Sequence, residues 1–226
     1  MTSRSLAGHM WHQIEPVHAT LSFSPQAFEE TSMIAEYVPA VWAVATPRQV
    51  NFERLTGHDA LARAGHLVEI YRSAFGEPPW CEDERAADAF AERLTTDVRR
   101  PGFTAVLAYD HGEPAGFGTA WRTRSPFPVG RAYDLVRAEL GDAVETRLVG
   151  ALEVDELAVS PHARRQGLAG RILDLLCDGD DACWLLTAPQ AEDAIRLYER
   201  LGWRRLTAAG ANVVVFSHRK AAGSAR

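Results

Sequence analysis

The sequence predicts an α+β fold in which a mixed, mostly antiparallel sheet carries helices on both faces. Three observations lead to this prediction. From residue 49 onward, strand-like apolar runs interleave with amphipathic helical runs. A tight-turn signal at residues 110–113 joins two strand-like runs into an antiparallel hairpin. Farther along, a strand, a helix and a strand follow one another, and such a crossover produces a parallel pair.

The first half of the predicted sheet region holds a strand, two helices and the hairpin. Gly57 and His58 are expected to turn the chain after the first strand. The segment Gly76-Glu77-Pro78-Pro79 ends the first helix, because proline cannot continue a helix. The predicted ranges are 50–55 for the strand, 60–74 and 82–98 for the helices, and 103–109 and 114–122 for the hairpin strands.

The second half begins with an irregular connection over residues 124–148 that contains a short helix near residues 133–140. Apolar residues then recur with strand and helix periods in turn. Gly202 fits the C-terminal cap of the last helix. The predicted ranges are 151–159, 182–187, 203–206 and 212–217 for strands, and 167–177 and 191–201 for helices.

Three regions follow from this pattern. Residues 1–48 form an N-terminal extension that is partly unstructured and whose role the sequence does not reveal. Residues 49–218 form the folded domain, and residues 219–226 form a disordered tail. Gly116 and Gly118 leave one part of the second hairpin strand without side chains, so a ligand or another segment could approach there.

Composition narrows the classes of function. The 226 residues are 46% hydrophobic and carry a formal charge of -6, which argues against a nucleic-acid-binding surface. No apolar run reaches the roughly 18 residues of a membrane span. No apolar run follows Arg4 as in a signal peptide, so we expect a cytoplasmic protein. The three cysteines and the histidines show no metal-ligand or disulfide spacing, so we expect no metal.

The stretch LEVDELAVSPHARRQGLAGRILDLL, residues 152–176, predicts an anion site. A strand ends at Val159, Ser160-Pro161 stops it, and a glycine-containing loop leads into an amphipathic helix. The first N–H groups of such a helix lack partners and lie at the positive end of its dipole, which suits phosphate. Neither the Walker pattern nor the dinucleotide fingerprint G-x-G-x-x-G is present.

This stretch resembles motif A of the GNAT acetyltransferase superfamily, written (Q/R)-x-x-G-x-(G/A). Here the motif reads Arg164-x-x-Gly167-x-Ala169, and it follows a strand that ends in V-x-P. Residues 194–203 are similar to the family's A-x-x-L-Y-x-x-x-G-(F/W) segment. The resemblance implies a GNAT-like fold in which the fourth and fifth strands, 152–159 and 182–187, splay apart.

The resemblance also implies an acetyl-CoA-dependent N-acetyltransferase. It implies that acetyl-CoA is a co-substrate held in two places. The strand residues Leu157, Ala158 and Val159 would pair with the pantetheine arm. The backbone of the following loop would hold the diphosphate, at Arg164, Arg165, Gln166, Gly167, Leu168, Ala169 and Gly170.

The resemblance also implies the mechanism of that family, which uses a base and an acid. Strict alternation puts Glu156 with the apolar Leu152, Val154 and Ala158, where desolvation would make it a better base. Glu153 occupies the position of the base in histone-type members and remains the alternative, because a bulge would reverse the faces partway along the strand. Tyr198 matches the tyrosine that serves as acid.

The acceptor is expected to be a primary amine of a small molecule or peptide. The region around Phe75 and Trp80 resembles the acceptor border of family members, and Trp121 is a further expected wall. Homodimers are common in the family, and the sequence does not determine the oligomeric state. The alternative function is a non-catalytic CoA-binding sensor or partner-binding module on the same fold.

Overall fold

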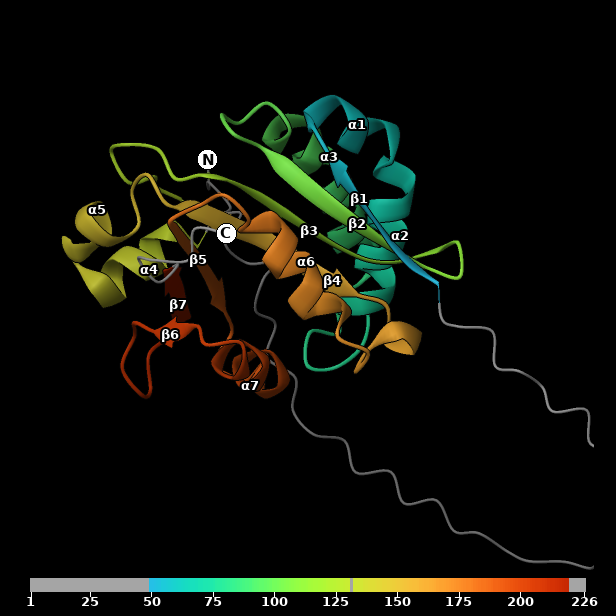
Figure 1. Cartoon of the computed structure of the whole chain (residues 1–226). Helices are drawn as coiled ribbons and strands as arrows, with labels where there is room; N and C mark the ends of the chain where they lie inside the picture. Colours follow the sequence, from blue (N-terminus) through green and yellow to red (C-terminus); the bar gives the residue numbers. More distant parts are fainter. Residues whose placement is uncertain (1–48, 131, 220–226) are drawn as a thin grey trace, which may run out of the picture.

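The computed structural model describes residues 49–130 and 132–219. Its strands are β1 (Val50–Leu55), β2 (Thr104–Asp110), β3 (Glu113–Arg122), β4 (Leu152–Val159), β5 (Ala182–Thr187), β6 (Arg204–Arg205) and β7 (Val214–Arg219). They form one sheet in the order β1-β2-β3-β4-β5-β7-β6 (Figure 1). Every neighbouring pair is antiparallel except β4 and β5, which confirms the predicted mixed, mostly antiparallel sheet.

The helices are α1 (Gly57–Ala62), α2 (Ala64–Phe75), α3 (Glu84–Asp97), α4 (Tyr133–Leu140), α5 (Ala143–Arg147), α6 (Leu168–Leu176) and α7 (Glu192–Arg200). They cover both faces of the sheet (Figure 1). On β2, Ala105 and Leu107 pack with α2 and α3, whereas Val106 and Ala108 pack with α6 and α7. Because side chains alternate along a strand, these two clusters lie on opposite faces.

The first helical region differs from the prediction of one helix over residues 60–74. It consists of α1 and α2, separated at Arg63, whose ψ of 8° departs from helical geometry. Gly57, expected in a turn, opens α1. The Asp59 carboxylate accepts hydrogen bonds from the Thr56 N–H at 3.2 Å and hydroxyl at 2.6 Å, which secures this first turn. The helix α5 was also not predicted from the pattern.

The strands β4 and β5 pair over only part of their length. Leu152, Glu153 and Val154 pair with Cys183, Trp184 and Leu185, and no described residue of β5 pairs with β4 beyond Val154. The two strands therefore splay, as expected, and the second half of β4 presents one open edge. This opening lies where β4 runs toward the head of α6.

A bulge interrupts β4 on its other side. Along the β3–β4 pair, Thr119 faces Glu156 but the next residue, Ala120, faces Val154, so Asp155 is the extra residue. An extra residue reverses the direction of the side chains beyond it. Accordingly, Val154 and Leu157, three positions apart, both pack with the α6 cluster, while Ala158 packs with α2 and α3.

The glycines of β3 admit another chain segment rather than a ligand. A Cβ atom added to Gly118 would lie 2.8 Å from Leu176 Cδ1 and 2.9 Å from Ile172 Cγ2, both on α6. One added to Gly116 would lie 3.3 Å from Ile172 Cδ1. The missing side chains therefore let α6 pack closely against β3, which fixes the distance of the α6 head from β4.

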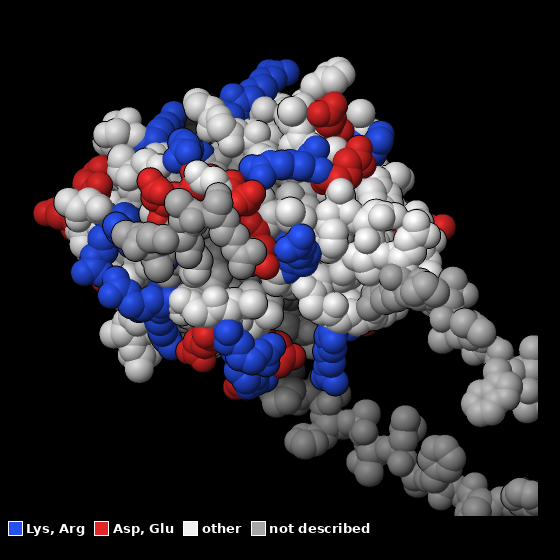
Figure 2. Space-filling view, in the orientation of Figure 1, with Lys and Arg blue, Asp and Glu red and all other residues white. Residues whose placement is uncertain are grey.

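Residues 1–48 and 220–226 lie outside the described residues, and so do the expectations for the extension and most of the tail. Arg219, expected in the tail, is the last residue of β7. Within residues 49–130 and 132–219, no helix is long and apolar enough to cross a membrane. Acidic and basic side chains are interspersed on the face shown in Figure 2.

Substituting Gly118 by alanine should lower the free energy of unfolding by about 1–3 kcal/mol, because the new methyl group overpacks the α6 contact. Chemical denaturation measures this change. Gly65 is the matched control, since a Cβ atom there meets nothing within 4 Å. Gly65→Ala should be neutral or stabilising. Equal losses in the two variants would show that the close α6 contact does not limit the substitution.

Candidate active site at the splayed strands

The loop after β4 turns sharply into α6. The Ser160 N–H donates to the Ala115 carbonyl at 2.9 Å, and a short 3-10 turn follows at Pro161–Ala163. Arg165 and Gly167 then adopt left-handed backbone conformations, with φ values of 61° and 79°. Glycine accepts this conformation without strain, which explains its place immediately before the helix.

The backbone N–H groups at the head of α6 have no acceptor among the described residues. In the described part of the chain, no group accepts a hydrogen bond from the N–H of residues 165–170, and the first such bond runs from Arg171 N to Gly167 O at 3.1 Å. The residues Arg165 to Gly167 are exposed. Clustered free N–H groups at the positive end of a helix dipole form an anion site.

The Arg164 side chain is committed to the protein. Its guanidinium forms an ion pair with Glu77 at 2.9 Å and donates to the Ala74 carbonyl at 2.9 Å and to the Val159 carbonyl at 3.3 Å. These contacts tie the loop to the end of α2. Arg164 therefore shapes the loop, and exposed Arg165 and Arg171 supply positive charge around the anion site.

The residues Leu157, Ala158 and Val159 pair with β3 through one edge of β4. Their other edge lies on the side where the pairing with β5 has ended. An open strand edge offers a row of N–H and C=O groups to an extended ligand. The structure thus places the three predicted residues between the anion site and the bulge.

The bulge brings Glu156 to the α2/α3 face, together with Ala158 but opposite Val154, so strict alternation was wrong on this point. There the Glu156 carboxylate accepts a charged hydrogen bond from Arg93 of α3 at 2.6 Å. Its side chain is 15% exposed. Arg93 also lies 3.8 Å from Asp97, which pairs with Arg100 at 2.6 Å.

Glu153 lies on the same face but in a different environment. It is 4% exposed, and its two carboxylate oxygens accept hydrogen bonds from the hydroxyls of Tyr133 at 2.7 Å and Thr123 at 3.2 Å. The Thr123 oxygen in turn accepts the indole N–H of Trp184 at 2.7 Å. Burial and the Glu153 charge raise the pKa of Tyr133. This network holds Glu153 in the part of β4 that pairs with β5.

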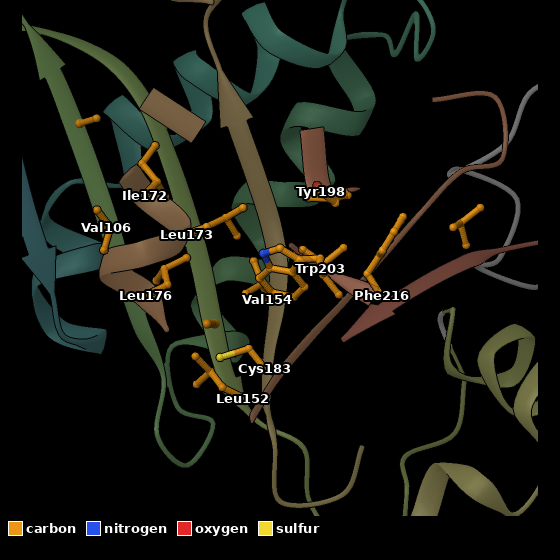
Figure 3. Close-up of a cluster of buried hydrophobic side chains, with 14 residues drawn as sticks. Val106, Leu152, Val154, Ile172, Leu173, Leu176, Cys183, Tyr198, Trp203 and Phe216 are labelled. Atoms are coloured by element: carbon orange, nitrogen blue, oxygen red, sulfur yellow. The ribbon is translucent and has the colours of Figure 1, made fainter. Parts of the chain in front are cut away.

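Tyr198 lies on the other side of the splay. Its ring packs near Trp203, at 6.2 Å between centroids, and near Phe216, at 5.4 Å (Figure 3). Burial raises the pKa of Tyr198, and the negative charge of Glu156 adds to this effect. The hydroxyl therefore stays protonated at neutral pH and lies within electrostatic range of Glu156.

A further carboxylate of this region, Glu82, was not predicted. The Tyr71 hydroxyl of α2 donates to Glu82 at 2.7 Å. Burial raises the pKa of Tyr71, with the charges of Glu156 and Glu82 next in effect. Burial also raises the pKa of Glu82. The one sequence signal was position, since Glu82 closely follows the proline-rich loop that carries Trp80.

The three expected acceptor residues fall into two groups. Phe75 and Trp80 meet edge to face, with centroids 5.7 Å apart, and Phe75 contacts Tyr71 at 4.6 Å. Trp121 lies elsewhere: it is buried on β3 beneath Arg100, at 4.5 Å, and lines a cavity of 60 Å³ next to Glu153. The structure therefore joins the first two residues to the Glu82–Tyr71 pair and places Trp121 with the Glu153 network.

No cluster of three or more histidine, cysteine or acidic side chains suited to a metal occurs in the part of the chain that the structure describes.

Comparison with known proteins gives a match to one family model. Residues 66–203 match the model of the acetyltransferase (GNAT) family. A search of curated proteins gave no match.

Solved structures with the same fold include three that the chain resembles over 76% of its length. PH1933 of Pyrococcus horikoshii has 17% identity, a TM-score of 0.54 and 99% of its chain covered. The PaiA N-acetyltransferase of Thermoplasma acidophilum, in complex with coenzyme A, has 12% identity, a TM-score of 0.53 and 99% covered. NAA60 of Arabidopsis thaliana, in complex with a bisubstrate analogue, has 16% identity, a TM-score of 0.50 and 98% covered.

Replacing Arg93 by alanine should lower the free energy of unfolding by about 2–3 kcal/mol, because the Glu156 charge is left largely buried without its cation. Arg72 is the matched control on α2. Its ion pair with Glu84 is as short, 2.6 Å, but the two side chains are 44% and 71% exposed. Arg72→Ala should cost about 1 kcal/mol or less. Denaturant titration compares them, and a similar loss in both would contradict this ranking.

Proposed function

This chain belongs to the acetyltransferase (GNAT) family, and from that premise we propose that it transfers an acetyl group from acetyl-CoA to a primary amine of a small molecule or peptide. We propose that residues 49–218 form the catalytic domain. The observation that carries the proposal is the set of free N–H groups at the head of α6, next to the open edge of β4.

The co-substrate fits the residues present. The N–H groups of residues 165–170 would bind the diphosphate of acetyl-CoA, with charge from Arg165 and Arg171. Leu157 to Val159 would pair with the pantetheine arm through the open edge of β4. The thioester would then lie at the splay, beyond the bulge, between Glu156 and Tyr198.

Glu156 is the proposed base. A typical alkyl amine has a pKa of about 10.4 and is mostly charged at neutral pH, so it must lose a proton before it attacks. The ammonium releases that proton to solvent. The neutral nitrogen then attacks the thioester carbonyl carbon, a C–N bond forms, and Glu156 takes the nitrogen's remaining excess proton directly or through water. Glu153 remains the alternative base, although its two oxygens are already bonded to hydroxyl groups.

Tyr198 is the proposed acid. When the carbon–sulfur bond breaks, the electron pair stays on sulfur, and the hydroxyl proton neutralises the thiolate. The hydroxyl carries its proton at neutral pH, as the role requires, although burial makes it a weaker acid than a free tyrosine. Phe75 and Trp80 are the proposed walls of the acceptor pocket, and Trp121 would act farther away, through the cavity at Glu153.

The proposed diphosphate site can be tested by introducing a negative charge there. The substitution Ala169→Glu places a carboxylate in the first turn of α6. There the carboxylate interacts favourably with the positive end of the helix dipole but repels a diphosphate. We expect affinity for CoA to fall about tenfold or more relative to Ala169→Gln, which has the same size. Isothermal calorimetry measures affinity, and thermal unfolding checks that the glutamate does not destabilise the fold. Equal CoA affinities in the two variants would contradict the proposal that the diphosphate binds at the head of α6.

Catalysis is tested by thiol release from acetyl-CoA with a panel of amines. Glu156→Gln should lower kcat by about 100-fold or more, as expected when a general base is lost. Tyr198→Phe should also lower kcat, and Glu153→Gln should have a smaller effect. Calorimetry of CoA binding is the control and should be unchanged in all three. CoA binding without release by the unsubstituted protein, with every amine, would instead support a non-catalytic CoA sensor.

A further inference from the structure

Glu82 is a carboxylate that forms no short-range ion pair with a described residue. The Arg93 charge acts on Glu82, but Arg93 forms its ion pair with Glu156 at 2.6 Å. Among the described residues, Glu82 receives a hydrogen bond from the neutral Tyr71 hydroxyl and forms no ion pair within 4.0 Å. It is half-buried, so water screens its charge only in part.

The ion pairs near Glu82 do not include its carboxylate. Arg93 pairs with Glu156 and lies 3.8 Å from Asp97, and Asp97 pairs with Arg100. Burial raises the pKa of Glu82, because the ionised form is costly to desolvate, and the Arg93 charge offsets this only in part. A bound cation would remove that cost.

Two aromatic residues lie in the same loop region as Glu82, and one of them, Phe75, contacts its hydrogen-bond partner Tyr71. The Glu82 N–H donates to the Phe75 carbonyl at 2.9 Å, which holds the loop beside the end of α2. Phe75 and Trp80 meet at 5.7 Å, and both are half-buried rather than enclosed in the core. Aromatic faces attract cations, most strongly where water is partly excluded. A carboxylate beside such rings suits an ammonium or guanidinium group.

The attacking nitrogen of the acceptor does not supply this cation. It must be neutral when it attacks, and its base is proposed to be Glu156. Tyr71 lies within electrostatic range of both carboxylates, so the two flank one region of the site. A molecule that reaches Glu82 while its amine lies near Glu156 would need a second charged group.

We propose that Glu82 is a specificity-determining residue that binds a second, cationic group on the acceptor, so that the preferred substrates are diamines and related dications. This inference rests on the proposed acetyl transfer. Glu82 contributes attraction and orientation, and the acetyl group is transferred to the amine at the other end of the acceptor.

The test compares two acceptors of equal carbon length, 1,4-diaminobutane and butylamine, by thiol release from acetyl-CoA. The unsubstituted protein should have a kcat/KM about tenfold or more higher for the diamine, the size expected for a charged contact. Glu82→Gln should remove most of this preference by raising the KM for the diamine, with kcat little changed. Glutamine can still accept the Tyr71 hydrogen bond, so the loop is preserved.

Glu84→Gln is the matched control, because Glu84 is an exposed acid two residues away that pairs with Arg72. It should leave the preference intact. The inference is overturned if the unsubstituted protein does not prefer the diamine, or if Glu82→Gln affects both acceptors equally. A failure of the proposed function looks different: no thiol is released with any amine by the unsubstituted protein.

Discussion

The extra residue at Asp155 in β4 is the constraint on which the site depends. Before it, β4 is an ordinary parallel partner of β5, and Leu152 and Val154 pack under α6. At that point the pairing with β5 ends, and beyond the extra residue the side chains reverse. One edge of β4 is thereby left open, and Glu156 is directed toward α3. A strand without the extra residue would have placed Glu156 under α6.

The packing of α6 completes this arrangement. Gly116 and Gly118 allow the helix to lie close against β3, and the Arg164 side chain ties the preceding loop to the end of α2. The free N–H groups at the helix head are thus held in line with the open edge of β4. These two features, the glycines of β3 and the anchored loop, fix the distance between the proposed anion site and the bulge.

Charge organises the residues around the splay. Arg93 pairs with Glu156, the two tyrosines at positions 71 and 198 stay protonated, and Glu82 forms no ion pair within 4.0 Å among the described residues. Glu153 has a different role, because its hydroxyl partners fix it where β4 and β5 still pair. Glu153 and Glu156 therefore lie on the same face of the sheet, and they differ in the groups that surround them.

The sequence alone determined the order of the strands, the mixed sheet and the loop that carries the proposed anion site, because these depend on local periodicity and on a loop motif that lies within a few residues. It could name Glu153, Glu156 and Tyr198, but not their surroundings. Tertiary structure decided the rest. Arg93 lies 63 positions from Glu156, and Trp121 separates from Phe75 and Trp80 because they belong to different elements. Such pairings arise only when distant segments pack, and the bulge that governs them is a property of two strands together rather than of one.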